Sequence, residues 1–303
     1  MLEVLRTTVN TWECDQMGHL NVRYYLAHAH AGLSVLALHC GLTPQALRAR
    51  EAHLRVRDQH LRFHKELRPG TPLCMKAAVL HASADRLRVL QELFSAKTTS
   101  SELAATVVSD VELTHGRECQ ALMLDPTFVE RARELATVLP AHAAPRGVAL
   151  EPPRRRPRRE EAIDLGMTGA FLGPVSASDC DTYGRMHESA FMGRVADGIG
   201  HFFRSLHEGF RPEGIGGAAL EYRYVFHARP RLGDVIEVRT GLKALGAKTL
   251  HMCHYIFDMA DGSCVATSEA IAVSFDLHAR KAVAIADPAR AAMQRHVIAG
   301  ISA

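Results

Sequence analysis

The sequence is short of the features that mark membrane, secreted and nucleic-acid-binding proteins. No run of about 18 uncharged apolar residues occurs, so we expect no membrane insertion, and the N-terminus lacks the apolar segment of a secretory signal. The seven cysteines form no Cys-x-x-Cys pair, which argues against a disulfide framework or a zinc knuckle and fits a reducing cytoplasm. A formal net charge of +3 is too small to indicate a nucleic-acid partner by itself. We therefore expect a cytoplasmic protein without a nucleic-acid partner.

The length and the apolar content allow two domains of ordinary size. The chain has 303 residues, of which 47% are hydrophobic and 23% are charged. Single domains commonly hold about 100–150 residues, and this share of apolar residues lets each half build its own core. Composition therefore predicts a globular protein with two domains, and the fold of these domains must be inferred from the pattern of residues.

A polar motif near the N-terminus recurs in the second half of the chain. Residues 13–25 read ECDQMGHLNVRYY, and residues 179–191 read DCDTYGRMHESAF. Both contain an acidic residue, Cys, Asp, two variable residues, Gly and a basic residue in the same order, and Asp15 and Asp181 lie 166 residues apart. A repeat of this kind bears on the fold of the whole chain, because each copy is expected to form the same structural unit.

Two further matches follow in the same order. Segment 60–73 parallels segment 223–236 at an offset of 163 residues, with Phe-His and a later Gly in register. Asp125-Pro126 and Asp287-Pro288 each precede a helical run and lie 162 residues apart. The order and the near-constant spacing of the matches indicate gene duplication and fusion.

Hydrophobic periodicity predicts the same succession of elements in each half: one strand, one long helix, a series of strands and a terminal helix. In the first half we expect the helix at 25–40 and strands at 3–12, 52–63, 73–81, 86–94 and 103–114. In the second half we expect the helix at 191–206 and strands at 171–178, 219–227, 234–242, 249–257 and 265–275. Gly41 and Gly209 are expected to end the helices, and Asp261-Gly262 to form a hairpin turn. The order predicts an α+β fold with an antiparallel sheet around each helix.

The repeat also predicts the domain boundaries, which are an N-terminal domain at 1–139, a linker at 140–165 and a C-terminal domain at 166–303. The linker is rich in Pro, Ala and Arg and lacks periodicity, which is typical of a solvated connector. Its arginine-rich run at 154–159 could instead contact phosphate groups, although Glu160 and Glu161 offset its charge. One unit alone would leave a sheet edge bare, so we expect the two fused copies to pair edges and pack as a pseudo-dimer.

The first copy of the motif has the chemistry that acyl transfer requires. The first turn of a helix offers unpaired backbone amides and the positive end of the helix dipole. Gly18 has no side chain, so a ligand carbonyl could approach the backbone closely. Asp15, just before this turn, could act on the same carbonyl as a nucleophile or as a general base through a water. An oxyanion hole and a carboxylate would suffice for an activated acyl group such as a thioester.

At these residues the chain resembles the 4-hydroxybenzoyl-CoA thioesterase branch of the hot-dog superfamily. That branch carries the pattern Asp-x-x-Gly-His-(apolar)-Asn-x-x-x-Tyr, and Arg68-Pro69-Gly70 before a strand is a further shared feature. The resemblance covers nearly the whole chain, once in each half, outside the linker. This sequence matches the pattern at Asp15, Gly18, His19, Asn21 and Tyr25.

The resemblance implies a tandem double hot-dog fold and an acyl-CoA thioesterase that uses no cofactor. Asp15 would be the catalytic carboxylate, and Gly18, His19, Asn21 and Tyr25 would contact the substrate or form the oxyanion hole. Sites in this family form between two hot-dog units, and double hot-dog chains are expected to assemble into homo-oligomers. Near the repeated strand start, Arg68, Arg229 and Arg231 are candidates for binding the CoA phosphates.

The second copy departs from the pattern. Asp181 and Gly184 are kept, but Arg185, His187 and Phe191 replace the histidine, asparagine and tyrosine of the first copy. We count Asp181 as a second candidate catalytic residue, and Gly184, Arg185 and His187 as candidate substrate contacts. The alternatives are a decayed site, a CoA-binding half or a site with an altered substrate.

A second feature of the family is a glutamate on the long helix, about fifteen residues after the motif aspartate. That position is His30 in the first copy and Ala196 in the second, where Asp197 is its neighbour. His28 and His30 fall on nearly opposite faces of the helix, which argues against a metal site.

Simpler structural roles compete with these assignments. Asp15 could cap the helix, because Asp is favoured at that position. Tyr25 and Phe191 fit the hydrophobic core better than a substrate contact. Cys14 and Cys180 could act as nucleophiles, but a small buried residue at a strand end is the better interpretation.

Two other functions fit the same fold. A non-catalytic acyl-CoA sensor or scaffold would bind the ester without turnover. Hot-dog hydratases use an Asp-x-Asn-Pro-x-His pattern, which this chain lacks in both halves because its Asp–His spacings are four residues (Asp15 to His19) and six (Asp181 to His187). Hydratase activity is therefore the weaker alternative.

Overall fold

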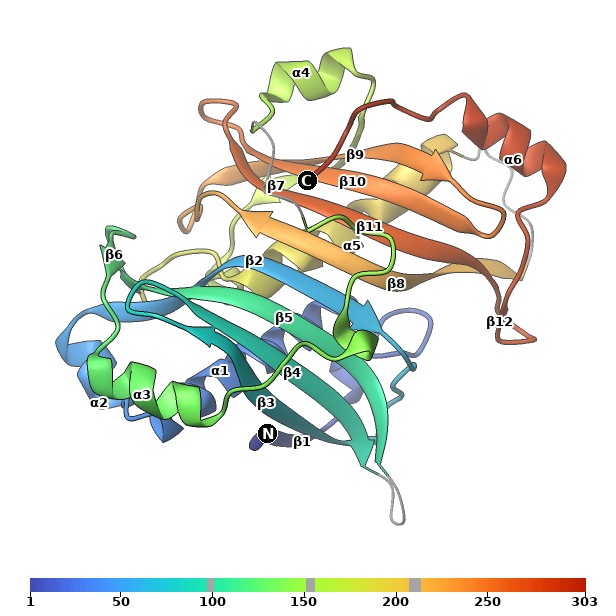
Figure 1. The fold of residues 1–303 in the computed structure, drawn as a ribbon. Helices are drawn as coiled ribbons and strands as arrows, with labels where there is room; N and C mark the ends of the chain where they lie inside the picture. Colours follow the sequence, from blue (N-terminus) through green and yellow to red (C-terminus); the bar gives the residue numbers. More distant parts are fainter. Residues whose placement is uncertain (97–100, 151–155, 207–213) are drawn as a thin grey trace. The chain divides into compact units, whose positions relative to one another are not determined.

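The computed structural model describes residues 1–96, 101–150, 156–206 and 214–303, and it divides the chain into two compact units, Met1–Ala144 and Pro145–Ala303 (Figure 1). Each unit contains one long helix packed on an antiparallel sheet. None of the helices within the described ranges is long and apolar enough to span a bilayer. The duplicated architecture that the repeat predicts is therefore present.

The first unit places its long helix on the sheet as the periodicity predicts. Its elements are β1 (Leu2–Thr8), α1 (Val22–His39), α2 (Pro44–Ala49), β2 (Ala52–Phe63), β3 (Pro72–Ala82), β4 (Leu87–Ala96), β5 (Ser101–His115), β6 (Ala121–Leu122) and α3 (Pro126–Glu134). The strands are hydrogen-bonded in the order β1-β3-β4-β5-β2, and β6 pairs with β5. Helix α1 packs against β1, β3 and β5, while α3 packs on β3.

The second unit repeats this arrangement. Its elements are α4 (Arg159–Asp164), β7 (Thr168–Pro174), α5 (Glu188–Leu206), β8 (Ile215–Phe226), β9 (Val235–Leu245), β10 (Thr249–Asp258), β11 (Cys264–Asp276), β12 (Lys281–Ala282) and α6 (Asp287–Gln294). The strand order β7-β9-β10-β11-β8 matches that of the first unit strand by strand. Gly262 has φ +68° in the hairpin between β10 and β11, as predicted. Gly209 lies outside the described residues.

The first strand of each unit ends earlier than the alternation predicts. In the first unit, the Asn10 side chain and the Glu13 backbone form a reciprocal capping box that starts the short helical turn Thr11–Glu13. Ser176 and Asp179 form the same box before the turn Ala177–Asp179. A capping box satisfies the amides that a continuing strand would otherwise have paired, so the chain turns toward its long helix at this point.

Each long helix lies close to the first strand of its unit because both carry a glycine at the contact. A Cβ on Gly198 would lie 2.5 Å from the carbonyl oxygen of Ala170 in β7. At the matching position, a Cβ on Gly32 would lie 3.0 Å from Val4 of β1. The first distance is too short for a real side chain and the second is tighter than most real contacts, so the repeated glycine allows the close approach of helix to sheet.

One buried polar position on the sheet differs between the units. Gln91 of β4 is fully buried, and its amide nitrogen donates to the Ala29 carbonyl of α1 at 2.8 Å. The residue at the matching position in β10 is His254, also fully buried, with Nδ1 2.9 Å from the hydroxyl of Thr240. Burial lowers the pKa of His254 to about 3, so the imidazole is neutral in the folded protein.

The segment expected to be a solvated connector is instead bound to the units at its two ends. Arg62 of β2 donates to the carbonyls of Ala141 and Ala144 at 3.2 and 2.8 Å, and Ala143 packs on Leu90 and Val108. Composition could not reveal this, because the anchors are strand residues far away in the sequence.

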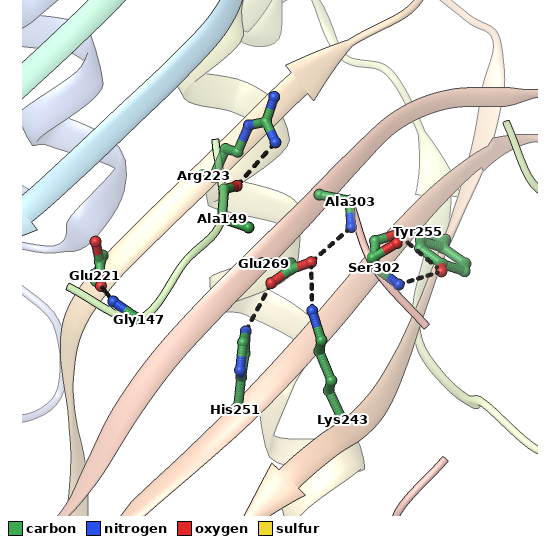
Figure 2. Close-up of polar contacts among 10 residues, drawn as sticks. All are labelled: Gly147, Ala149, Glu221, Arg223, Lys243, His251, Tyr255, Glu269, Ser302 and Ala303. Atoms are coloured by element: carbon green, nitrogen blue, oxygen red, sulfur yellow. Dashed lines mark hydrogen bonds and ion pairs between the residues drawn. The ribbon is translucent and has the colours of Figure 1, made fainter. Parts of the chain in front are cut away.

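The second unit holds the continuation of this segment in the same way (Figure 2). Glu221 of β8 accepts hydrogen bonds from the amides of Arg146 and Gly147, both at 2.9 Å, and Arg223 donates to the Ala149 carbonyl. Further on, α4 buries Ala162 and sets Arg159 2.6 Å from Glu237. Of the arginine run, 154 and 155 lie outside the described residues.

An extended tail follows the terminal helix in both units. Val79 of β3 forms a parallel bridge to Ala136 after α3, and Leu242 of β9 forms the matching bridge to Val297 after α6. In the second unit, Glu269 anchors the tail by accepting from the Ala303 amide at 3.0 Å (Figure 2). Residues 136–144 are therefore part of the repeated unit and correspond to the C-terminal tail.

Candidate active site

The Asp15 loop (residues 13–21) is a closed polar turn between the first strand and α1. Cys14 and Leu20 form an isolated antiparallel bridge. The Asp15 amide donates to the His19 carbonyl, and the Gly18 amide donates to the Asp15 carbonyl, both at 2.9 Å. Gly18 has φ +71°, a conformation that favours glycine. The sequence places Gly here because the turn cannot close otherwise without strain.

The carboxylate of Asp15 is held by its own loop through one oxygen. Oδ1 accepts hydrogen bonds from the amides of Met17 and His19, at 2.8 and 3.4 Å. Among the residues that the structure describes, the other oxygen, Oδ2, has no hydrogen-bond or ion-pair partner, and the side chain is half-buried. A Cβ on Gly18 would meet nothing within 4 Å, so the space over the turn is open. The loop thus presents an oriented carboxylate oxygen that can accept a proton or attack a carbonyl.

Helix α1 is capped by Asn21, and the alternative that Asp15 caps it is wrong. The Asn21 side chain accepts from the Arg23 amide at 3.0 Å, and its carbonyl accepts from the Tyr24 amide. The Asn21 amide itself donates to the Glu13 carbonyl. In the described part of the chain, the Val22 amide of this first turn has no acceptor.

His19 and Tyr25 lie at different depths beside this loop. His19 Nε2 is 3.6 Å from Oε2 of Glu66, and its side chain is largely buried. Tyr25 is buried and packs edge-on against Phe63, with ring centroids 4.9 Å apart. Burial raises the pKa of Tyr25, so its phenol stays protonated and cannot serve as a base. Tyr25 is a core residue, in line with the simpler of its two sequence interpretations.

A buried acid–base contact ties the start of each loop to its long helix, and sequence reasoning missed it. Glu13 Oε1 lies 3.7 Å from Nε2 of His28 on α1. Burial lowers the pKa of His28, and the nearby Glu13 only partly opposes this. In the second unit Asp179 forms an ion pair with Arg194 of α5. The signal was present, since an acid and a base recur at the same 166-residue offset in both pairs.

The Asp181 loop (residues 179–187) has the same backbone as the first. Cys180 and Met186 form the matching bridge. The Asp181 amide donates to the Arg185 carbonyl, and the Gly184 amide donates to the Asp181 carbonyl. Oδ1 of Asp181 accepts from the amides of Tyr183 and Arg185 at 2.9 and 3.0 Å. Gly184 has the same φ as its counterpart, +71°.

The charges around Asp181 differ from those around Asp15. Oδ2 of Asp181 lies 3.7 Å from the guanidinium of Arg229, which also forms an ion pair with Glu188. The side chains of Arg229 and Glu188 are each only 3% exposed. Arg185 donates to the Arg229 carbonyl at 3.2 Å. The assignment of Arg229 to the phosphates of a ligand is therefore wrong, because its charge is buried and already paired.

The other candidate residues serve local contacts. Nδ1 of His187 lies 2.9 Å from the Ser189 hydroxyl. Asp197 is 48% exposed at its side chain and pairs with Arg194 at 2.9 Å. His30 stacks on His53, with ring centroids 5.5 Å apart. The helix position that carries a glutamate in related proteins therefore supplies no carboxylate to the Asp15 loop.

The cysteines before the two aspartates are poor nucleophiles. Burial and the neighbouring carboxylates raise the pKa of Cys14 and of Cys180, so both remain thiols near neutral pH. Within the ranges that the structure describes, no group of three or more His, Cys, Asp or Glu side chains could hold a metal ion. The loops therefore offer carboxylates, imidazole and backbone amides for chemistry.

Comparison with known proteins identifies the fold and the family. The family model of the thioesterase-like superfamily matches residues 9–131 and 175–293, once in each unit. A Lactobacillus plantarum protein assigned as an oleoyl thioesterase has a TM-score of 0.66 and 10% identity, over 89% of this chain and 95% of its own. No curated protein matches the sequence.

Two further solved structures span both units. An acyl-ACP thioesterase from Bacteroides thetaiotaomicron has a TM-score of 0.64 and 10% identity, over 88% of this chain and 96% of its own. A 12:0-ACP thioesterase from Umbellularia californica has a TM-score of 0.64 and 11% identity, over 89% of this chain and 93% of its own. At such identities the likeness concerns the fold, and the predicted tandem double hot-dog is confirmed.

Proposed function

The chain belongs to the thioesterase-like superfamily, and from this premise we propose that it hydrolyses acyl-CoA thioesters to a free acid and CoA at the Asp15 loop. Membership of the superfamily supports thioester hydrolysis in general. That CoA is the acyl carrier, that Asp15 is the catalytic residue and that backbone amides form the oxyanion hole are our proposals. The single observation that carries the proposal is the Asp15 carboxylate, which has one oxygen fixed by two amides and the other without a partner among the described residues.

Asp15 would act by one of two routes. As a general base, its Oδ2 takes a proton from a water whose oxygen attacks the thioester carbonyl carbon. The carbon–sulfur bond then breaks, and the CoA thiolate leaves and takes up a proton. As a nucleophile, the carboxylate attacks the carbonyl carbon and expels the CoA thiolate, and water then hydrolyses the acyl–Asp15 anhydride. Both routes need a carboxylate oxygen that is oriented and not already paired.

The carbonyl oxygen becomes negative in either route and needs donors. We propose that the first turn of α1 supplies them, with the Val22 amide as a candidate because it has no acceptor among the described residues. Gly18 leaves the space over the turn open. His19 and Asn21 then act as positioning residues, since the His19 amide orients Asp15 and the Asn21 side chain caps the helix.

The Asp181 loop would not share this chemistry. The buried guanidinium of Arg229 lies 3.7 Å from Oδ2 of Asp181, so this carboxylate oxygen already faces a cation. We propose that Gly184, Arg185 and His187 maintain the fold of this loop and contribute no step to hydrolysis.

The test compares two matched variants. Asp15→Asn removes the charge but keeps the size and the hydrogen bonds to Oδ1, and we expect it to lower kcat at least about a hundredfold. Asp181→Asn makes the same change in the other loop, and we expect it to leave kcat within about threefold once folding is verified by circular dichroism. Free thiol would be measured on acyl-CoAs with short, long, aromatic and charged acyl groups.

Other results of this test would contradict the proposal or indicate a different function. Wild-type turnover by Asp15→Asn on every substrate would remove Asp15 from the mechanism. Tight acyl-CoA binding without turnover would favour a sensor. Because the solved structures named above include acyl-ACP thioesterases, the panel should also hold acyl groups on a carrier protein, and turnover of those alone would exclude CoA as the carrier.

A further inference from the structure

The only tryptophan of the chain lies beside the Asp15 loop and is exposed to solvent. Trp12 is 74% exposed and stands three residues before Asp15, on the short turn Thr11–Glu13. Tryptophan brings a large apolar surface and an aromatic face, and proteins usually bury at least part of it. An indole left in solvent next to a candidate active site indicates a surface that a ligand covers.

The surroundings of Trp12 add a second ring and a cation. The Tyr24 hydroxyl lies 3.5 Å from the Trp12 carbonyl, which brings the start of α1 against the turn. The guanidinium of Arg23 lies over the Tyr24 ring, 5.5 Å from its centroid. The capping box between Asn10 and Glu13 fixes the backbone of the turn. Trp12, Arg23 and Tyr24 thus lie where the turn meets the start of α1, and we call these three residues the Trp12 platform.

At the matching positions, the second unit has no such platform. The residues at the matching positions are Ser178, Ser189 and Ala190, none of which is aromatic or charged. The backbone of the two turns is nevertheless the same, with a capping box in each. The aromatic and cationic side chains therefore accompany the loop with the available carboxylate and are not required by the turn.

We propose that the Trp12 platform binds the adenine nucleotide end of CoA while the thioester lies at the Asp15 loop. The flat face of a purine stacks on an indole or a phenol ring, and an arginine adds a positive charge that can bind the phosphates. The proposal rests on the function proposed above, since it names how that site recognises its carrier.

The local charges favour a small flat anion over an acidic protein surface. Arg23 is the cation within the platform, and a single guanidinium suits a nucleotide phosphate. An acidic carrier protein would call for a broader positive field.

Trp12 provides its own readout, because a chain with one tryptophan has intrinsic fluorescence from one site. We expect adenosine 3′,5′-bisphosphate and CoA to change the Trp12 emission saturably, and pantetheine, which lacks the nucleotide, to leave it unchanged. No change of emission at CoA concentrations that saturate turnover would overturn the proposal.

The kinetic test compares substrates with and without the nucleotide. We expect Trp12→Ala to lower kcat/KM for an acyl-CoA about tenfold or more relative to the same acyl-pantetheine, the range of a lost base–aromatic stack. Trp12→Phe should retain most of that preference. Ser178→Ala, at the matching position of the second unit, should leave it unchanged.

The two proposals can fail separately. Saturable quenching by CoA without hydrolysis of any acyl-CoA would sink the proposed function and keep the platform. Hydrolysis of acyl-CoA with an unchanged preference in Trp12→Ala would sink the platform and keep the function. Loss of turnover in Trp12→Ala with acyl carrier protein substrates alone would also overturn the nucleotide assignment.

Discussion

Asp15 and Asp181 lie in loops with the same backbone hydrogen bonds, the same glycine at φ +71° and the same two amides on Oδ1. What differs is the charge that faces the second carboxylate oxygen. In the second unit it is a buried arginine, Arg229, and in the first unit the residue at the matching position is Glu66, which lies near His19. The comparison teaches that the loop motif determines a conformation, while residues about fifty positions further on determine the charge that faces its carboxylate.

Two residues around the Asp181 loop differ from their counterparts in the first unit and form a pair with each other. Glu188 occupies the position of Val22, and Arg229 occupies that of Glu66, so the second unit has both an acid and a base that the first unit lacks at these positions. Their side chains are buried to the same extent and form an ion pair. A buried cation with a partner on each side is stable only as a set, because each charge left alone would lack solvent. The second loop therefore uses its aspartate as part of a structural network.

The largest expected effect comes from breaking this network. Arg229→Met keeps the apolar volume but leaves Glu188 and Asp181 without their cation, and we expect it to lower the free energy of unfolding by about 3–5 kcal/mol. Urea denaturation would measure it. Glu66→Gln, the matched change in the first unit, removes a charge that is 38% exposed, and should cost no more than about 1 kcal/mol.

A double variant separates charge from packing. Glu188→Val with Arg229→Met places the first unit's residue type at position 188 and removes the Arg229–Glu188 ion pair as a unit, while Asp181 keeps the two amide hydrogen bonds to its Oδ1. Replacing a whole buried pair by apolar residues is often neutral, so most of the stability lost in Arg229→Met should return. If the double variant is as unstable as the single one, packing by the long side chains accounts for the loss, and charge pairing does not.

The next prediction uses the buried polar position on the two sheets. Burial lowers the pKa of His254 to about 3, well below the ordinary value of 6.5. The unfolded chain therefore binds a proton more readily than the folded one, and stability decreases as the pH falls from about 6.5 toward 3. His254→Gln introduces the residue found at position 91, which does not titrate.

We expect His254→Gln to reduce the loss of unfolding free energy between pH 6.5 and pH 4, while Gln91→His should increase it. Denaturant titrations at several pH values would compare both variants with the wild type. An unchanged pH dependence in His254→Gln would mean that His254 is not responsible for acid sensitivity.

Glu269 contributes to the pH dependence of stability in a different pH range. Burial alone would raise its pKa, but hydrogen bonds from His251, Lys243 and the Ala303 amide lower it to about 2, so its contribution is lost only below about pH 4.5.

The fold could be read from the sequence because its signals are local and occur twice. Alternating strands, the helix periodicity and the C-terminal Gly41 agree with the structure, in which Gly41 has φ +95° and follows the last turn of α1. The loop was found for the same reason, since Asp15 and Gly18 lie within one short motif. The repeat then carried each assignment from one unit to the other.

The missed features depend on contacts between distant residues. The sequence predicts a ligand-binding cation at Arg229, because nothing near it in sequence reveals that Glu188 and Asp181 face it. Composition predicts a connector at 140–165 and does not show that its first part is bound, because the anchors Arg62, Glu221 and Arg223 are strand residues far away in the sequence. The composition of a segment indicates whether it forms regular structure, but whether it binds to the protein surface depends on the residues that it contacts there.

The smallest expected effect tests the part of the comparison in which the two loops are alike. Gly18 and Gly184 share φ +71°, and a Cβ on either would meet no atom within 4 Å. Alanine at each position therefore costs only the left-handed backbone conformation, about 1 kcal/mol. We expect Gly18→Ala and Gly184→Ala to lower the unfolding free energy equally, measured by urea denaturation. Because the methyl group of Gly18→Ala would stand in the open space over the turn where we propose that the thioester binds, only this variant should also lower kcat/KM. Equal activity in the two variants would show that the thioester does not approach the turn at Gly18.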